Sequence, residues 1–199
     1  MQGQRILIVD DEASLRTALF RALDRKGYQV ITSGSYKEAE TISHSDKALD
    51  LAIVDLRLPD GDGMELMSKL RAIHQNIQVI ILTGHASIET AVEATRRGAF
   101  HFVTKPCNLD EIMTLVDRSL SHSQLAQENQ HLRNALHQKY QFENIIGQSE
   151  AIMQVLGMIE RVAQSDSTVL VMGESGTGKE LIAKALHYNS TRGKEPFIP

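Results

Sequence analysis

The sequence predicts an α/β fold, in which a doubly wound, five-stranded parallel sheet is followed by a linker helix and an incomplete second α/β unit. Two observations support this prediction. Over residues 5–121, short apolar runs alternate with amphipathic stretches of helical length, the order of elements that is typical of a parallel sheet with helices on both faces. The apolar runs are also nearly continuous, as expected of strands that are buried on both sides.

The five expected strands are short runs rich in Ile, Leu, Val and Phe, residues that favour strands. Each run is followed by a polar or glycine-containing segment, which is where a strand is expected to end. The strands are predicted at residues 5–9, 29–32, 51–54, 78–82 and 100–103.

The stretches between the strands have the spacing and the first residues of helices. Leu15, Leu19 and Leu23 share one helix face, and Gly27 ends that helix. A further helix is predicted over residues 87–97. Three others begin with a capping-box pattern, a polar cap followed three residues later by Glu. These pairs are Ser35 with Glu38, Asp62 with Glu65, and Asn108 with Glu111.

Composition limits the function of these residues. The formal net charge is -4 and no long run of Lys or Arg is present, so we do not expect this part of the chain to bind nucleic acid. The single cysteine, Cys107, excludes an intramolecular disulfide, and we interpret it as a small packed residue. No apolar stretch approaches the roughly 20 residues that span a bilayer, and no secretion signal is present. We therefore expect no membrane partner and a cytoplasmic location.

Polar side chains follow four of the expected strands, at the point where each strand ends. In an open parallel sheet, ligands bind at this edge, near the point where the strand order reverses. Each short motif alone is weak evidence, because Asp-Asp, Thr-Gly and Lys-Pro are common in caps, turns and loops. Together they predict one site. Its candidate residues are Asp10 and Asp11 after the first strand, Asp55 after the third, Thr83 after the fourth and Lys105 after the fifth.

The chemistry of this predicted site follows from its charges. Clustered carboxylates repel one another unless a cation neutralises them, and oxygen ligands of this kind suit Mg2+. Mg2+ and Lys105 would together attract a phosphoryl group, which the carboxylate of Asp55 could attack as a nucleophile. The alternative is a metal site with a structural role. Thr83 and Lys105 argue against it, because Mg2+ alone needs neither.

These residues resemble the receiver domain of two-component response regulators, which has a flavodoxin-like fold. The resemblance covers residues 5–121, and it implies that Asp55 accepts a phosphoryl group from a phosphohistidine of a sensor histidine kinase. It also implies that Asp11, Asp55 and the backbone carbonyl of Arg57 hold Mg2+, with Asp10 acting through water. The matched residues are Asp10, Asp11, Asp55 within the segment 54–61, Thr83, Phe102 and Lys105 with Pro106.

The same resemblance implies a switch. Lys105 would pair with the phosphoryl group, Thr83 would move to hydrogen-bond it, and Phe102 would turn inward behind Thr83. Phe102 replaces the commoner Tyr, so rotation and packing must carry the signal without a hydroxyl. The side chain of Arg57 either influences the lifetime of the phosphate or is a solvated cation, and both interpretations stay open.

Residues 122–143 are rich in Gln, Asn, His and Ser and predict a linker helix. Leu125, Asn129, Leu132 and Leu136 are spaced four, three and four residues apart. That spacing, with an asparagine in the seam, favours a short two-stranded coiled coil and hence a dimer. A single solvated helix is the alternative.

A second globular unit is expected after residue 143. It has an apolar helix face over 152–162, a strand at 168–172, and a helix from about 178 to 187. The glycine-rich turn between that strand and that helix has the context of a phosphate-binding loop, in which backbone N–H groups and Lys179 face the phosphates. A flexible glycine turn is the alternative. The loop reads Gly173, Glu174, Ser175, Gly176, Thr177, Gly178, Lys179 and Glu180.

Glu180 stands where the general loop motif has Ser or Thr, and this departure points to a second family. The segment 145–163, the loop and residues 180–183 resemble the start of the AAA+ ATPase domain of activators of sigma-54 RNA polymerase. The resemblance implies ATP at the loop and, in a full-length parent, sigma-54 RNA polymerase and DNA as partners. The Walker B strand, arginine finger and DNA-binding helices of that family are missing, so we expect a truncated domain without ATP hydrolysis.

Three parts are therefore expected: a receiver domain over 1–121, a helical linker over 122–143 and an AAA+ fragment over 144–199. The expected function is a phosphorylation-dependent response regulator in which the receiver controls the attached ATPase domain. Two alternatives stay open. One is a short regulator or phosphate sink that pairs through the linker, and the other is a P-loop ATPase with a structural acidic site.

Overall fold

A computed structural model of the 199-residue chain describes residues 3–44, 48–84, 87–139 and 149–199. The chain divides into two compact units, Met1–Leu125 and Ala126–Pro199, and each is described by itself. No helix in the described ranges combines the length and the apolar character needed to cross a membrane.

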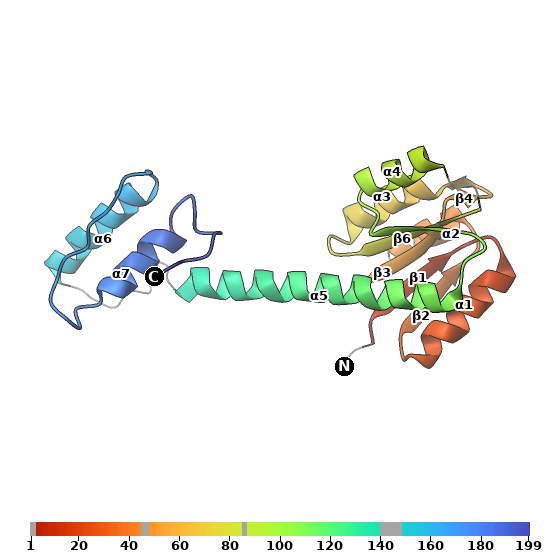
Figure 1. Ribbon diagram of the computed structural model, residues 1–199, viewed down its shortest axis with the longest axis horizontal. Helices are drawn as coiled ribbons and strands as arrows, with labels where there is room; N and C mark the ends of the chain where they lie inside the picture. The colour runs from red at the N-terminus through yellow and green to blue at the C-terminus, as the bar shows by residue number, and fades with distance from the viewer. Residues whose placement is uncertain (1–2, 45–47, 85–86, 140–148) are drawn as a thin grey trace. The chain divides into compact units, whose positions relative to one another are not determined.

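A five-stranded parallel sheet forms the centre of the first unit (Figure 1). Every neighbouring pair in it is parallel. The predicted fold class is confirmed, and the strand bounds differ from the predicted ones by one residue at most. In spatial order the strands are β2 (Gln29–Ser33), β1 (Arg5–Val9), β3 (Leu51–Asp55), β6 (Gln78–Thr83) and β7 (His101–Thr104).

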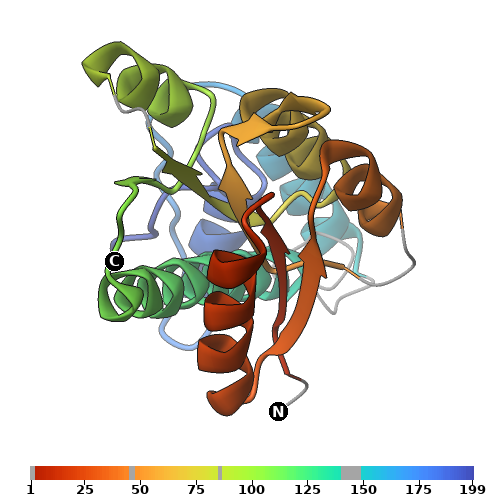
Figure 2. The ribbon, with the colours of Figure 1, turned by 90° about the vertical axis from the view of Figure 1, so that its right-hand side faces the viewer.

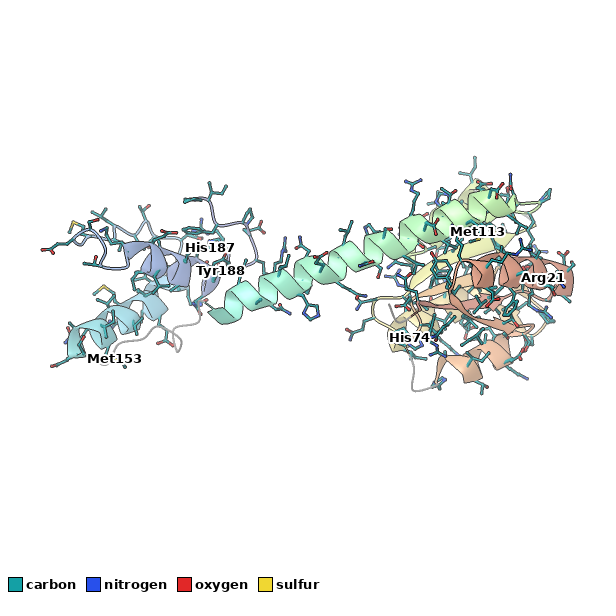
Figure 3. The ribbon with its side chains drawn as sticks, turned by 90° about the horizontal axis from the view of Figure 1, so that it is seen from below. Arg21, His74, Met113, Met153, His187 and Tyr188 are labelled. Carbon is teal, nitrogen blue, oxygen red and sulfur yellow. The ribbon has the colours of Figure 1, made fainter. Side chains whose placement is uncertain are left out.

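Helices cover both faces of this sheet (Figure 2). On one side lie α1 (Ala13–Arg25) and the first part of α5 (Leu109–Lys139); on the other lie α2 (Tyr36–Ser43), α3 (Gly63–Ile73) and α4 (Ile88–Arg96). Successive strand residues enter alternate cores, because side chains of a strand point to opposite faces. In β3, Leu51 packs with α1 and α5, and Ala52 packs with α2 and α3. Met113, labelled in Figure 3, belongs to the core on the α5 side.

The predicted helix starts are confirmed, although two of the Glu side chains bond elsewhere than a capping box requires. Ser35 accepts a hydrogen bond from the N–H of Glu38 at 3.3 Å, and Asp62 accepts one from the N–H of Met64 at 2.7 Å. The carboxylate of Glu38 accepts from the N–H of Gly34 at 2.9 Å. Satisfied N–H groups at the first turn stabilise both helices.

A small antiparallel hairpin after β3 was not predicted. It consists of β4 (Arg57–Leu58) and β5 (Gly61–Asp62), with Arg57 opposite Asp62 and Leu58 opposite Gly61. Its tip is Pro59-Asp60. The order Pro-Asp-Gly is a turn signal, because Pro presets φ, Asp bonds to nearby backbone and Gly tolerates unusual dihedrals. The sequence therefore contained the information for this turn.

Helix α5 runs without a break from Leu109 to Lys139, a length of 31 residues. The last receiver helix and the first part of the predicted linker are thus one continuous element. The expected seam residues Leu125, Leu132 and Leu136 lie on it and are exposed, at 66%, 60% and 40%. Exposed leucines at this spacing are typical of a helix that pairs with another helix.

The second unit contains α6 (Glu150–Ala163) and α7 (Lys179–Tyr188). The strand predicted at residues 168–172 is wrong: this segment has no regular structure. A strand needs a neighbour to hydrogen-bond its backbone, and the described part of this unit holds no other strand. The side chains of Leu170 and Met172 are correspondingly exposed, at 80% and 82%.

Candidate functional site

Three carboxylates gather at the carboxyl edge of the sheet. The strand order reverses between β1 and β3, the point at which ligands bind in this kind of sheet. Asp10 and Asp11 follow β1, and Asp55 ends β3. One oxygen from each lies within 4.8 Å of the others. Asp10 and Asp55 are buried and Asp11 is exposed, so the cluster opens to solvent on one side.

Lys105 brings its ammonium group into this cluster. Its Nζ lies 2.5 Å from Oδ2 of Asp55 and 2.6 Å from Oδ2 of Asp10. The backbone holds the residue there, since the N–H of Lys105 donates to the carbonyl of Thr83 at 2.7 Å. The peptide bond that follows, to Pro106, is cis. Residues 50 positions apart in the chain thus form a close ion pair.

The backbone also orients the two buried carboxylates. The N–H of Arg57 donates to Oδ1 of Asp55 at 3.0 Å, and the N–H of Glu12 donates to Oδ1 of Asp10 at 2.9 Å. One oxygen of each carboxylate is therefore held by a loop N–H. The other oxygen faces Lys105 and the centre of the cluster.

The pKa values of the pair reflect this burial and contact. Burial raises the pKa of Asp10, and the ammonium of Lys105 opposes that rise without cancelling it. Burial alone would lower the pKa of Lys105, but the carboxylates of Asp10 and Asp55 raise it above its ordinary value. Lys105 is therefore a permanent cation at neutral pH, available to pair with an anion.

The donor set fits a divalent cation. Oδ2 of Asp10 is fully buried, and Nζ of Lys105 lies 2.6 Å away as an ion pair. Because the same ammonium also pairs with Asp55, the carboxylates keep a net negative charge, which a divalent cation would offset. All the candidate ligand atoms are oxygens, which Mg2+ prefers. The residues present therefore suit Mg2+.

The two expected switch residues lie at the same end of the sheet. Thr83 ends β6 and is 1% exposed. In the register of the sheet it is opposite Thr104, the residue before Lys105. Phe102 of β7 is partly buried and packs against the core on the α3 side of the sheet. Thr83 thus lies at the strand edge from which the carboxylates project, and Phe102 lies against a helix-covered core.

Gly63 is a site residue that sequence reasoning missed. Its N–H donates to the carbonyl of Leu56 at 2.9 Å. A Cβ at Gly63 would lie 2.1 Å from the backbone carbonyl oxygen of Asp55, closer than any real contact. Position 63 therefore requires glycine, so that α3 can start against the backbone of the acidic residue. Gly63 follows Asp62 at a helix start, and nothing in that local pattern reveals how closely position 63 approaches the backbone of Asp55.

The glycine-rich loop lies in the second unit, immediately before α7. Gly176 and Gly178 have φ of 83° and 85°, a conformation that favours glycine. The ammonium of Lys179 donates to the carbonyls of Gly173 and Glu174, at 2.9 and 2.6 Å. Glu180 instead pairs with Lys184 at 2.6 Å. The remaining predicted loop residues, Ser175 and Thr177, lie between the two positive-φ glycines or beside them.

Comparison with known families decides the identity. The model of the response regulator receiver domain matches residues 6–117, more than half of the chain. The chain belongs to the response regulator receiver family. A second model, the sigma-54 interaction domain, matches residues 145–199. The receiver is therefore followed by residues that match the sigma-54 interaction domain, which confirms the family predicted from the sequence.

The curated relatives of this chain are regulatory proteins. The regulatory protein AtoC of Escherichia coli K12 is 41% identical over 194 residues, which cover 98% of this chain and 42% of AtoC. The DNA-binding transcriptional regulator NtrC of Klebsiella pneumoniae is 41% identical over 198 residues, covering 100% and 41%. This response regulator is thus homologous to regulators of transcription. It spans about two-fifths of the length of these relatives.

Solved structures agree with this assignment. NtrX from Brucella abortus, solved in complex with ADP, is 34% identical with a TM-score of 0.63 and covers 99% of this chain and 42% of NtrX. A CheY-like receiver domain protein from Methanospirillum hungatei JF-1 is 28% identical with a TM-score of 0.60. That match covers 63% of this chain and 99% of the other, as expected of a receiver compared with a receiver.

Proposed function

We propose that Asp55 is the phosphoacceptor of this response regulator and that a sensor histidine kinase supplies the phosphoryl group. A carboxylate oxygen of Asp55 forms a new bond to phosphorus, while the bond from phosphorus to the kinase histidine nitrogen breaks. The leaving nitrogen keeps the electron pair. The observation that carries this proposal is the 2.5 Å contact between Asp55 and Lys105 inside a cluster of three carboxylates.

Lys105 and Thr83 act on the transferred group. The ammonium of Lys105 offers a fixed positive charge to the phosphoryl oxygens, which is worth most in a partly buried site. The hydroxyl of Thr83, at the end of β6, donates a hydrogen bond to the product. Phe102 then packs inward behind Thr83 and passes the change to the surface formed by α4, β7 and α5.

The carboxylates of Asp11 and Asp55 and the backbone carbonyl of Arg57 would hold Mg2+, with Asp10 acting through a water molecule. When bound, Mg2+ supplies positive charge that offsets the repulsion between the carboxylates and the incoming phosphoryl group. The burial of Asp10 and the close grouping of the three carboxylates support this assignment.

The output of the receiver is control of the attached sigma-54 interaction domain. We assign residues 1–121 to the receiver, 122–143 to the linker and 144–199 to the start of the AAA+ domain. The linker joins two copies of the chain through the exposed leucines of α5. In the longer protein, the AAA+ domain would act on sigma-54 RNA polymerase and DNA, in the cytosol.

ATP is the proposed ligand of the loop from Gly173 to Glu180. The ammonium of Lys179 donates hydrogen bonds to two loop carbonyls. In the nucleotide complex it would donate to the phosphate oxygens instead. The two positive-φ glycines let backbone N–H groups converge on an anion. The ADP-bound relative NtrX supports a nucleotide as the ligand class.

Intact-mass measurement tests the phosphoacceptor. The protein is incubated with Mg2+ and acetyl phosphate, in which the bond from phosphorus to the acetyl oxygen breaks and acetate leaves. We expect one added phosphoryl group on the wild-type protein and none on the Asp55→Asn variant. Asp24→Asn, which changes an exposed carboxylate of α1 outside the cluster, is the matched control and should still be labelled. Equal labelling of wild type and Asp55→Asn would remove Asp55 from this role.

A further inference from the structure

The tip of the β4–β5 hairpin is tied to the start of α2 by one carboxylate. Oδ1 of Asp60 accepts a hydrogen bond from the N–H of Tyr36 at 2.7 Å, and Oδ2 accepts one from the N–H of Lys37 at 3.1 Å. These are the first two residues of α2, whose N–H groups have no partner within the helix. A carboxylate at this end also interacts favourably with the helix dipole. The bond to Lys37, followed by that to Tyr36, lowers the pKa of Asp60, so the carboxylate stays charged at neutral pH.

A second contact holds the hairpin at the same place. The ring of Tyr36 lies directly over Gly61, where an added Cβ would come within 2.5 Å of a ring carbon. The hydroxyl of Tyr36 donates to Glu65 of α3 at 3.1 Å. Tyr36 is buried. The hairpin is therefore packed against the first turn of α2 both by a capping carboxylate and by an aromatic ring.

The base of the hairpin reaches the acidic cluster. Arg57 is opposite Asp62 in the hairpin, and its N–H donates to Oδ1 of Asp55 at 3.0 Å. The N–H of Gly63 closes the loop by donating to the carbonyl of Leu56 at 2.9 Å. A displacement of the tip would therefore move the Arg57 backbone, and with it the group that orients the Asp55 carboxylate. Asp60 itself does not reach the cluster.

We propose that Asp60 is a positioning residue for the metal site: by capping α2 it fixes the β4–β5 hairpin and, through it, the Arg57 backbone and the Asp55 carboxylate. This inference rests on the proposed function, because it takes Asp55 and Arg57 as Mg2+ ligands. It assigns to the α2 capping interaction a role beyond the stability of α2. Groups that orient metal ligands from outside the site govern metal affinity in the same manner.

Titration calorimetry with Mg2+ alone, on the unphosphorylated full chain, tests this role. We expect Asp60→Ala to raise the Kd for Mg2+ by about 10-fold, in the range found when residues that support metal ligands are removed. Asp60→Asn keeps one acceptor oxygen, so its Kd should be intermediate. The matched control is Ser35→Ala. It removes another cap of the same helix, the acceptor for the N–H of Glu38 at 3.3 Å, without touching the hairpin.

Urea unfolding of the same proteins separates affinity from stability. Ser35→Ala and Asp60→Ala should both shift the unfolding midpoint downwards, but the Kd of Ser35→Ala should stay within about twofold of wild type, because its metal ligands keep their support. An unchanged Kd in Asp60→Ala overturns the inference, and so does an equal rise in both variants. If the wild type itself binds no Mg2+, the proposed function fails as well. One pattern supports both the inference and the proposed function. Wild type binds Mg2+, Asp60→Ala binds it with a raised Kd, and Ser35→Ala keeps a Kd near that of wild type.

Discussion

Lys105 places its Nζ 2.5 Å from Oδ2 of Asp55 and 2.6 Å from Oδ2 of Asp10. The two carboxylates come from strands that are neighbours in the sheet, and the lysine follows the edge strand β7. One ammonium therefore pairs with two buried carboxylates and leaves them with a net negative charge. In the proposed function, the phosphoryl dianion is the third charged group to join this arrangement.

Lys105→Met should destabilise the metal-free protein. The substitution leaves two carboxylates without their cation, so we expect the free energy of unfolding to fall by about 2 kcal/mol. This is less than the full cost of breaking a buried pair, because Lys105 is partly exposed. Saturating Mg2+ should restore more stability to the variant than to wild type. Urea unfolding with and without Mg2+ measures both effects.

The control is Lys26→Met, which breaks a Lys–Asp pair of the same length, 2.6 Å, on the surface. It should cost less than about 1 kcal/mol, since exposed pairs contribute little, and its loss should not depend on Mg2+. An equal loss for Lys105→Met in both buffers would contradict a metal site at Asp10 and Asp55.

Gly63→Ala should damage the site through packing alone. The new Cβ would meet the carbonyl oxygen of Asp55 at 2.1 Å, so the start of α3 must move away, at a cost of about 2–3 kcal/mol. The rate of labelling by acetyl phosphate should fall as Asp55 shifts. Gly84→Ala, whose Cβ has nothing within 4 Å, should change stability by less than about 0.5 kcal/mol. Similar behaviour of the two variants in unfolding and labelling would be evidence against this packing.

His74 should make stability fall in acid. It lies at the end of α3 (Figure 3) and is 9% exposed. Its Nε2 is 3.0 Å from the carbonyl oxygen of Ser43. Because a carbonyl oxygen can only accept a hydrogen bond, Nε2 carries the proton. Burial lowers the pKa of His74, an effect that the bond to Ser43 partly opposes. The unfolded chain therefore takes up the proton first, and stability is lost as the pH falls from the ordinary histidine pKa of about 6.5 through the lower folded value.

His74→Gln should remove part of this pH dependence, because an amide can donate to Ser43 without titrating. We would measure urea unfolding of both proteins at pH 7.5 and at pH 5.5. His101→Gln, at an exposed strand residue, should lose as much stability between these pH values as wild type. If His74→Gln also loses as much, His74 does not titrate on unfolding.

The exposed seam of α5 predicts self-association. Leu132 is 60% exposed and lies centrally among the spaced leucines, so Leu132→Ser should weaken a dimer by removing apolar contact area. Asn129→Ile should strengthen it, because a polar residue in the seam costs stability. Sedimentation equilibrium of the full chain measures the association. His131→Ser, off the seam, should leave it unchanged, and a monomeric wild type would contradict the linker role.

The sheet could be predicted from sequence because its rules are local. Continuous apolar runs such as Leu51–Val54 fit a strand buried on both faces, and parallel order then brings the ends of β1, β3, β6 and β7 to one edge. Geometry alone gathers Asp10, Asp55 and Lys105 there. The family resemblance added the roles of Thr83 and Phe102, which remain predictions.

The rest depended on contacts between distant residues. Asp60 and Tyr36 are 24 positions apart, and neither has a local pattern that reveals their bond. The segment 168–172 has the composition of a strand, but backbone pairing needs a neighbour that composition cannot supply. The unbroken length of α5 was not predicted. Its residues change from apolar to polar near position 121, which suggested a boundary, but such a change alters burial without ending a helix.

Mapping the modified residue tests the central claim most directly. After treatment with Mg2+ and acetyl phosphate, borohydride reduces an aspartyl phosphate to homoserine, and fragmentation of tryptic peptide 48–57 then distinguishes Asp50 from Asp55. We predict homoserine at position 55 and none at position 50. Reduction at Asp10, Asp11 or any other carboxylate, with position 55 intact, would contradict the role of Asp55 as phosphoacceptor.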